Sequence, residues 1–414
     1  MNALKAISLF TGAGGLDLGF EAAGFETAVA VEMDSRCVRT LRANRGWPVI
    51  ERDVSCVGTE ELLATAGLRQ GEADVLIGGP PCQPFSKSGF WATGEARRLN
   101  DPRASTIDHY LRILEEAQPQ AFLLENVEGL GFRGKDEGLR RIESALDLIN
   151  RRHDTRYRPA VAVLCAADFG VPQTRRRLFV IGSRDGAPFR FPESTHLNPE
   201  LAAGGDNRRL WMTAWDALHD LPEPDAPELK AKGKWADLLP TIPEGRNYLH
   251  HTDRGDGEPL FGWRRRYWSF LLKLAKDQPA WTLQAQPGPA TGPFHWTSRR
   301  LSMREMARLQ TFPDSFEVTG SVADAQRQLG NAVPALLAEV LARAIRGQLL
   351  RSSAPTDEPA LQIRKAGCIP APEQPARVPP RYLALRGPHE AHPGTGRGFR
   401  ASIREADLPL LAAE

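Results

Sequence analysis

Residues 73–89 have the sequence ADVLIGGPPCQPFSKSG, and this stretch decides which fold the chain can adopt. Its apolar half is typical of a buried strand. The prolines that follow fix φ and remove N–H donors, so the backbone there continues neither a helix nor a sheet. A free cysteine is usually a small buried hydrophobe, but the polar, proline-rich flanks of Cys82 are not those of a core. The stretch therefore predicts a strand followed by a rigid loop that presents Cys82 as a nucleophile.

The composition is that of an ordinary globular chain. Its 414 residues are 41% hydrophobic and 25% charged, which is enough for two or three domains with cores of their own. The five cysteines are scattered and form no CxxC pair, so we expect neither a disulfide framework nor a metal site. No apolar run is long enough to span a bilayer, and the first residues, MNALKAISLF, resemble a core strand more than a signal peptide. We therefore predict a cytoplasmic protein without a membrane partner.

Strand-like and helix-like segments alternate in the first third of the chain. The strand-like runs are AISLF (6–10), TAVAVEM (27–33), ADVLIG (73–78) and AFLLENV (121–127). Helical lengths between strands imply crossover connections and a parallel sheet. Two later runs, AVAVLCA (160–166) and RLFVIGSR (177–184), are joined by a short connection that suits an antiparallel pair. The pattern predicts the α/β class, with a doubly wound, Rossmann-like sheet.

The pattern becomes irregular after about residue 186. Seven of the nine tryptophans lie between Trp211 and Trp296, which indicates a second unit with its own small core. An amphipathic helix returns at 335–350, and after Ser352 the composition shifts to Pro, Ala and Arg. We therefore predict three parts. They are a sheet domain made of residues 1–185 and 320–350, a smaller domain at 186–319, and a disordered tail at 352–414.

A glycine-rich turn, LFTGAGGLDLGF (9–20), follows the first strand. Its first three glycines are Gly12, Gly14 and Gly15. Such a turn permits close backbone approach to a ligand at the start of a helix. Asp17 takes the third glycine's place in G-x-G-x-x-G, so the dinucleotide fingerprint is incomplete. Glu32 ends the second strand, where an acid can bind ribose hydroxyls. Asp53 follows a further strand-like run, PVIER (48–52), and could bind an adenine amino group, although a helix cap is its simpler role. These residues indicate an adenosine-containing cofactor, either NAD or S-adenosylmethionine.

Two further motifs belong to the same sheet. Glu125 closes the apolar run AFLLENV, and a carboxylate in that position is either capped locally or functional. In QTRRR (173–177) the strand period places Gln173, Arg175 and Arg177 on one face. Two guanidinium groups there suit an anion or a polar heterocycle, and a solvated charge ladder is the alternative. No histidine lies in a motif that recommends it as the base of a cysteine hydrolase.

The order of these motifs resembles the DNA (cytosine-5) methyltransferase family, in its bacterial restriction-modification form. The order is FTGAGG, VEMD, GGPPCQPFS, ENV, QTRRR, RRLSMREMARLQTFPDSF and QLGNAVP, covering residues 6–184 and about 280–345. The resemblance implies a Rossmann-like S-adenosylmethionine domain with a small target-recognition domain. It also implies methyl transfer to C5 of a cytosine flipped out of a specific double-stranded DNA sequence, through a bond between Cys82 and C6.

The resemblance implies a role for each matching residue. Cys82 is the nucleophile, Glu125 holds and protonates the cytosine ring, and Arg175 and Arg177 grip the base and support the catalytic loop. The implied cofactor residues are Phe10, Gly12, Gly14, Gly15, Glu32, Asp53, Pro81 and Asn331. One departure is GNAV in place of Gly-Asn-Ser-Val, which removes any hydroxyl contact at Ala332.

DNA contacts are expected in two places. Beside the thiol, Gln83 can fill the vacated base stack, and Ser86 lies on the same loop. In the second domain, WRRRYW (263–268) and HWTSRR (295–300) interleave basic and aromatic residues as phosphate and base contacts do. From these runs we predict contacts by Arg264, Arg265 and Arg299.

The resemblance further implies a monomer that binds double-stranded DNA, lies at the nucleoid and is paired in function with a restriction endonuclease. Three alternatives remain. An RNA methyltransferase of the same chemistry would carry a Cys-Phe-Thr tripeptide, which is absent. A nicotinamide oxidoreductase would need a glycine at Asp17 and gives PPCQPFS no role. An inactive DNA-binding relative is disfavoured because the cysteine, the glutamate and both arginines are present.

Overall fold

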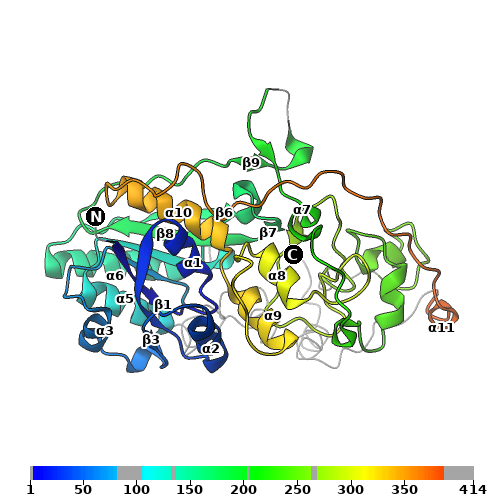
Figure 1. Cartoon of the computed structure of the whole chain (residues 1–414), viewed down its shortest axis with the longest axis horizontal. Coiled ribbons are helices and arrows are strands. Elements are labelled where there is room, and N and C mark those ends of the chain that lie inside the picture. Colours follow the sequence, from blue (N-terminus) through cyan, green and yellow to red (C-terminus); the bar gives the residue numbers. More distant parts are fainter. Residues whose placement is uncertain (1–2, 82–104, 132–136, 203–204, 263–267, 387–414) are drawn as a thin grey trace, which may run out of the picture.

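A seven-stranded sheet organises the first half of the chain (Figure 1). The computed structural model describes residues 3–81, 105–131, 137–202, 205–262 and 268–386. The strand order is β3-β2-β1-β4-β5-β8-β6. The strands are β1 (Leu4–Leu9), β2 (Phe25–Val31), β3 (Val49–Ile50), β4 (Val75–Gly78), β5 (Ala121–Val127), β6 (Ala160–Cys165) and β8 (Arg176–Ser183). The strand order reverses between β1 and β4, and ligands of open α/β sheets bind at such a switch point.

The sheet is mixed in the way the sequence predicts. Strands β1 to β5 pair in parallel, whereas β8 is antiparallel to both β5 and β6. The connection from β6 to β8 is too short for a crossover helix, so the chain must turn back beside β6. The α/β, Rossmann-like fold class is confirmed, and so is the antiparallel pair.

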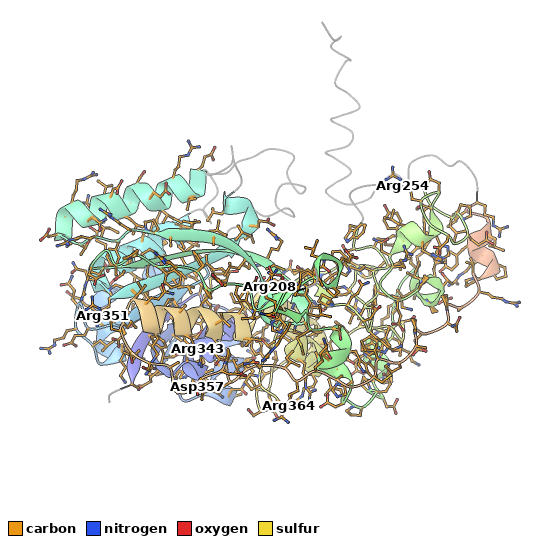
Figure 2. All side chains as sticks on the ribbon, turned by 90° about the horizontal axis from the view of Figure 1, so that it is seen from above. Arg208, Arg254, Arg343, Arg351, Asp357 and Arg364 are labelled. Atoms are coloured by element: carbon orange, nitrogen blue, oxygen red, sulfur yellow. The ribbon has the colours of Figure 1, made fainter. Side chains whose placement is uncertain are left out.

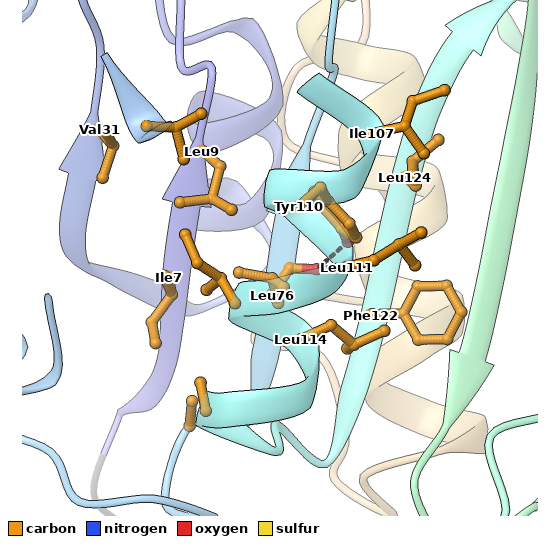
Figure 3. Packing of buried hydrophobic residues seen from close by; sticks show 14 of the residues in the cluster. Ile7, Leu9, Val31, Leu76, Ile107, Tyr110, Leu111, Leu114, Phe122 and Leu124 are labelled. Atoms are coloured by element: carbon orange, nitrogen blue, oxygen red, sulfur yellow. Dashed lines mark hydrogen bonds between the residues drawn. The ribbon is translucent and has the colours of Figure 1, made fainter. Parts of the chain in front are cut away.

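Helices cover both faces of the sheet. The helices are α1 (Gly15–Ala22), α2 (Ser35–Asn44), α3 (Thr59–Ala66), α5 (Ser105–Ala117), α6 (Glu137–His153), α7 (Ala214–Leu218), α8 (Met303–Leu309), α9 (Val322–Asn331), α10 (Ala335–Gln348) and α11 (Pro380–Leu383). One core, under α3, α5 and α6, contains Tyr110, whose hydroxyl donates to the carbonyl oxygens of Leu76 (3.1 Å) and Leu123 (2.9 Å) (Figure 3). The opposite core lies under α1 and α10. Residues 335–350 therefore return to the sheet domain, as their amphipathic pattern predicts.

The second unit contains little regular structure. Strand β9 (His196–Leu197) pairs with β10 (Arg209–Leu210), and β11 (Ala280–Trp281) pairs with β7 (Gln173–Thr174). Short 3-10 helices account for much of the rest of this unit: η6 (Pro199–Leu201), η7 (Pro227–Leu229), η8 (Ala236–Thr241) and η9 (Tyr248–His251). Three others, η1 (Val54–Cys56), η4 (Glu128–Gly131) and η5 (Ala166–Phe169), lie in the sheet domain. Because this unit has almost no ladder, its own buried side chains must hold it together.

Two cores do so. The junction core joins the units, because it combines Ala13 and Leu18 beside the sheet with Ala214, Trp296 and side chains of α8 and α9. The distal core lies farther out and is built from Leu238, Leu239, Ile242, Tyr248, Leu260, Leu271, Phe294 and Tyr382, with the rings of Trp235, Phe261 and Phe270. Helix α8, which lies in the predicted recognition domain, packs within this junction core.

The prediction of a disordered tail is wrong for residues 352–386. This segment crosses the molecule from α10 to α11, and Tyr382 near its end is only 3% exposed (Figure 1). Apart from the short helix α11, residues 352–386 form neither a helix nor a strand, but an extended chain can still be fixed by side-chain anchors on the protein surface it follows. Residues 387–414 lie outside the described residues. In the described part of the chain, every helix is too short or too polar to cross a membrane.

Candidate active site

Four predicted ligand-binding residues follow four neighbouring parallel strands. Phe10 follows β1, Glu32 follows β2, Asp53 follows β3, and Pro81 follows β4. Parallel strands end at the same edge of a sheet, so these residues lie along one rim beside the β1/β4 switch point. The rim therefore has the location and the residue types that an adenosine-containing ligand needs.

Backbone groups hold the Glu32 carboxylate at this rim. The N–H of Gly12 donates to Oε2 at 2.7 Å, and the N–H of Asp34 donates to Oε1 at 2.7 Å. Burial raises the pKa of Glu32, and these N–H groups oppose the rise. Each carboxylate oxygen accepts more than one hydrogen bond, so both retain capacity toward a ligand hydroxyl.

The three glycines of the turn serve different purposes. Among the described residues, the atom nearest to a Cβ built on Gly12, at φ +58°, would be the Phe10 carbonyl oxygen at 4.0 Å. At Gly14, with φ +82°, it would come within 3.0 Å of Leu41. At Gly15 it would lie 2.2 Å from the carbonyl oxygen of Val333. Gly12 thus leaves open space for a ligand, whereas Gly15 is required by close packing of α1 against the turn that follows α9.

The remaining cofactor candidates have distinct local settings. Phe10 itself adopts φ +54°, a left-handed conformation that is uncommon outside glycine. Asp53 caps η1, because its side chain accepts the N–H of Ser55 at 2.8 Å, and this bond lowers the pKa of Asp53. Asn331, the last residue of α9, is exposed. The cap role of Asp53 is therefore established, and ligand contacts by these residues stay a prediction.

Glu125 lies inside the same edge, one strand beyond Pro81. The residue is 8% exposed, and Oε1 forms an ion pair with Nε of Arg177 at 3.0 Å. Burial raises the pKa of Glu125, and Arg177 and Arg175 oppose the rise. Burial likewise lowers the pKa of Arg177, and Glu125 opposes that change. The site therefore holds a carboxyl group whose proton is retained more strongly than in water.

The ENV and GGPP segments fit closely together. A Cβ on Gly79 would lie 2.8 Å from Oε2 of Glu125, so a side chain there would displace the carboxylate. Nδ2 of Asn126 donates to the Pro80 carbonyl at 3.1 Å. Thr106, in α5, donates its hydroxyl to the Pro81 carbonyl at 3.1 Å. The backbone that leads to position 82 is thus fixed against the strand that carries Glu125.

The predicted alternation of QTRRR is confirmed. Gln173 and Arg175 are fully buried, whereas Arg176 is exposed. Arg175 donates to the Gly330 carbonyl (Nη2, 2.9 Å) and to the Leu283 carbonyl (Nη1, 3.3 Å). Burial and the neighbouring Arg177 lower the pKa of Arg175. Arg177 therefore pairs with the carboxyl group, and Arg175, between β7 and β8, ties this part of the chain to helix α9 and to the second unit.

One predicted DNA contact is corrected by the structure. Arg299 is 8% exposed, and its guanidinium binds Glu305 through Nη1 (2.8 Å) and Nη2 (2.7 Å) and Glu223 through Nε (2.6 Å). These carboxylates neutralise the positive charge that would otherwise attract a DNA phosphate, so Arg299 stabilises the fold. Five other predicted residues lie outside the described residues: Cys82, Gln83, Ser86, Arg264 and Arg265.

The sequence did not single out two features of this region. The first is the close approach of Gly79 to Glu125, which the Gly-Gly pair before Pro-Pro could have indicated, because glycine often marks a site of close packing. Trp268 and Trp281 are 50% and 38% exposed, and their rings contact each other edge to face, with centroids 5.6 Å apart. Trp281 lies in β11, which pairs with the strand that leads to Arg175. Within the described residues, no three His, Cys, Asp or Glu side chains gather as a metal site.

Comparison with known proteins assigns this arrangement to one family. A family model for C-5 cytosine-specific DNA methylases matches residues 4–347. Type II methyltransferase M.SacI of Streptomyces achromogenes is 43% identical over 84% of this chain and 93% of its own length. Type II methyltransferase M.AquIA of Picosynechococcus is 42% identical over 55% of this chain and 92% of its own length. A DNA modification methyltransferase encoded within an E. coli prophage has a similar structure (TM-score 0.57, 26% identity, 84% of this chain and 100% of that one).

Proposed function

Because the chain belongs to the family of C-5 cytosine-specific DNA methylases, we propose that it methylates C5 of a flipped-out cytosine through a covalent bond between Cys82 and C6. It is a DNA (cytosine-5) methyltransferase of the restriction-modification type. The observation that carries the proposal is the buried Glu125, held 3.0 Å from Arg177 and against the backbone of the GGPP segment. The family assignment also removes the nicotinamide oxidoreductase as an alternative.

S-adenosylmethionine is the methyl donor that we propose, and the rim fits it. Gly12 leaves open space in front of its backbone, and Glu32 presents a fixed carboxylate suited to ribose hydroxyls. Phe10, Asp53, Pro81 and Asn331 complete the set of residues that would hold the cofactor. When bound, the cofactor supplies an electrophilic methyl group on a sulfonium centre, and the protein supplies the arrangement that brings C5 of cytosine to it.

The chemistry explains why a thiol and a protonated carboxyl group are needed together. Cytosine C5 is too electron-poor to accept a methyl cation equivalent directly. Addition of the Cys82 thiolate to C6, with a proton passed from Glu125 to N3, converts the ring into an enamine whose C5 is nucleophilic. After methylation, water takes the C5 proton, the Cys82 thiolate departs and the N3 proton returns to Glu125, which restores the aromatic ring and both catalytic groups. The raised pKa of Glu125 supports this role, because burial makes its carboxyl group hold a proton more strongly than a carboxyl group in water does.

Arg177 supports the acid in the same scheme. Its Nε holds Oε1 of Glu125, which fixes the direction in which the carboxyl group faces the base. Arg175 acts through position: it anchors the strand that carries Arg177 to the Gly330 and Leu283 carbonyls. This assignment makes Arg177 the catalytic arginine and Arg175 a positioning residue.

The reacting C6 atom is unreachable inside a duplex, so the cytosine must leave the helix. We assign Gln83 and Ser86, beside the thiol, to the vacated stack and the catalytic loop. Arg264 and Arg265 are assigned to phosphate or base contacts, and the exposed pair Trp268–Trp281 offers an apolar surface near them in sequence. We propose that the enzyme acts as a monomer and protects its DNA site from a restriction endonuclease.

A transfer assay tests the proposal. Purified protein is incubated with duplex DNA and S-adenosylmethionine tritiated in its methyl group, and label in DNA is counted. We expect the parent protein to transfer label to cytosine, and bisulfite sequencing locates the methylated position. We expect Cys82→Ser to abolish labelling. Label that never enters DNA would refute methyl transfer, and label that survives Cys82→Ser undiminished would refute the covalent route.

A further inference from the structure

The segment that crosses the molecule after α10 is best described as a C-terminal strap, residues 352–386. It starts beside α10, passes over α7 and ends at α11 on the far side of the second unit (Figure 1). In Figure 2 the labelled residues Arg351, Asp357 and Arg364 mark the first part of this path. The family match ends at residue 347, so the strap lies beyond the residues that define the family.

The first anchor of the strap is a buried carboxylate in α10. The Glu339 side chain is completely buried, and its two oxygens accept the N–H groups of Ala360 (2.6 Å) and Leu361 (2.8 Å). Burial raises the pKa of Glu339, and these two N–H groups oppose the rise. A buried carboxylate without donors is costly, so the helix and the strap stabilise each other here.

The strap then crosses the junction between the units. The N–H of Ala366 donates to Oδ1 of Asp216, in α7, at 2.8 Å. Leu361 and Ile363 pack against the junction core, and Leu361 also touches the core beneath α10. The strap therefore contacts both units before it reaches the distal core.

The second anchor is a buried lysine of the second unit. Nζ of Lys276, whose side chain is 5% exposed, binds Glu244 (2.7 Å), Glu373 of the strap (3.2 Å) and the Ala371 carbonyl (3.2 Å). The N–H of Glu373 donates to the same Glu244 oxygen at 2.8 Å. One cation thus joins a carboxylate of the second unit to a carboxylate and a carbonyl of the strap.

The strap ends inside the distal core. The Tyr382 ring stacks on Trp235 with centroids 5.8 Å apart, and its hydroxyl donates to the Lys234 carbonyl at 2.7 Å. Trp268 lies in the same lobe, meaning the part of the second unit built around the distal core. Its backbone carbonyl accepts a hydrogen bond from Nδ2 of Asn247 at 2.7 Å, and Asn247 directly precedes Tyr248 of that core. A single chain segment therefore connects the helix α10 of the sheet domain with the lobe that carries Trp268.

We propose that the C-terminal strap is a positioning element, which holds the distal core and its DNA-facing residues in register with the carboxyl edge of the sheet through Glu339 and Lys276. This inference rests on the proposed function only for its kinetic readout. Apparent affinity for a ligand falls with the fraction of molecules in the binding-competent arrangement. Releasing the strap should therefore raise KM for DNA and leave turnover of bound DNA nearly unchanged.

The test cuts the strap without removing any residue. A recognition site for a sequence-specific protease is inserted between Cys368 and Ile369, both of which are exposed, in the full chain. After complete cleavage we expect KM for DNA to rise about fivefold, with kcat and KM for S-adenosylmethionine within about twofold of the uncut sample. Hydrogen exchange should accelerate in residues 235–250. The parent chain treated with the same protease is the control.

Two results would overturn the proposal. One is an unchanged KM for DNA after full cleavage; the other is a parallel loss of cofactor binding and kcat, which would mean general destabilisation. If the uncut protein transfers no methyl group at all, the proposed function fails, but hydrogen exchange still decides the strap. In that case, exchange in residues 235–250 that does not respond to cleavage would overturn the positioning role.

A matched pair of strap carboxylates sharpens the test. Glu373→Gln weakens the bond to Lys276, whereas Glu358→Gln changes an exposed carboxylate that lies 3.9 Å from Arg209. We expect Glu373→Gln to raise KM for DNA about twofold and Glu358→Gln to leave it unchanged. Equal effects of the two substitutions, or no effect of Glu373→Gln, would show that the Lys276 anchor does not carry the strap.

Discussion

Two buried arginine–glutamate pairs, one in each unit, show how the same residues serve different purposes. In the second unit Glu305 is 3% exposed, and it binds Nη1 and Nη2 of Arg299 at 2.8 and 2.7 Å and the N–H of Ser302 at 2.7 Å. At the sheet edge Glu125 is 8% exposed and binds Nε of Arg177 at 3.0 Å. The first carboxylate is fully surrounded by donors, and the second has an arginine on one oxygen.

The pKa directions of the two acids differ accordingly. Burial tends to raise the pKa of Glu305, but bonds from Arg299 and the nearby His295 outweigh burial, and the net pKa is lowered. For Glu125 burial prevails over Arg177 and Arg175, and the pKa is raised. A well-paired carboxylate stabilises the fold as an anion, whereas one that has fewer donors among the described residues and lies at a ligand-binding edge can carry a proton to a substrate.

The strongest challenge to this comparison is to neutralise each acid in turn. Glu125→Gln should lower kcat for DNA methylation about a thousandfold, because the amide cannot pass a proton to the cytosine ring. Glu305→Gln should leave kcat per folded molecule within about threefold of the parent, because Glu305 lies in the structural cluster. Methyl transfer at saturating substrates, normalised to the folded fraction, measures both. Equal losses in the two variants would contradict the assigned roles.

Stability should respond in the opposite order. Arg299→Met leaves Glu305 and Glu223 facing each other without their cation, and we expect a loss of about 3 kcal/mol in the free energy of unfolding. The control Arg300→Met should change it by less than about 1 kcal/mol. Urea unfolding followed by circular dichroism measures the difference. A stable Arg299→Met variant with weakened DNA binding would restore the original prediction that Arg299 contacts DNA.

A third buried carboxylate, that of Asp17, binds no arginine within the part of the chain that the structure describes. Burial raises the pKa of Asp17, in α1, from 3.8 to about 7, against weaker opposing hydrogen bonds from Ser8 and Thr27. The folded state therefore holds this proton where the unfolded chain has released it. The stabilisation is complete below pH 3.8 and is lost as the pH rises toward about 7. We expect Asp17→Asn to flatten this fall, with a gain of about 2 kcal/mol over the parent at pH 8. Parallel stability curves for the two proteins between pH 5 and pH 8, measured by urea unfolding, would contradict the burial of a protonated acid.

The smallest effect is expected at the exposed tryptophan pair of the second unit. Trp268→Ala removes half of an exposed aromatic pair and should raise KM for DNA about threefold, with kcat unchanged. Leu201→Ala, at a side chain that is 75% exposed, is the matched control and should have no effect. A fluorescence titration with duplex DNA and steady-state kinetics measure the change. If both variants bind as the parent does, the tryptophans are ordinary surface residues.

The sequence predicted the sheet domain far better than the second unit, for a physical reason. Each strand from β1 to β5 is a short apolar run bounded by turn residues, and periodicity reports such burial directly. The second unit is fixed by contacts between distant residues, such as Lys276 with Glu373, which no local pattern contains. The wrong prediction of a DNA contact by Arg299 has the same cause. Basic residues next to aromatic ones look like a DNA surface until the carboxylates that surround them are known.

The same limit explains why the sequence predicted neither the anchors of the strap nor the separate roles of the glycines in the turn. The proline-rich composition after Ser352 agrees with the little regular structure in residues 352–386, which is the short helix α11, but it could not reveal that Glu339 and Lys276 anchor this segment. In the turn, the spacing identified the right loop, yet only the fold shows that Gly15 is needed by Val333 and that Gly12 leaves open space. Motif order predicts where a site lies, and packing decides which residue in the motif is free to act.

The most direct test of the central claim compares the two acids in covalent bond formation. DNA in which the target cytosine is replaced by 5-fluorocytosine cannot lose its C5 substituent, so an enzyme that adds Cys82 to C6 should remain attached after methylation. With S-adenosylmethionine present, we expect a denaturation-stable adduct through Cys82 in the parent and in Glu305→Gln at similar rates per folded molecule. Glu125→Gln should form it about a thousandfold more slowly. An adduct that forms equally fast in Glu125→Gln, or none in the parent, would contradict the account.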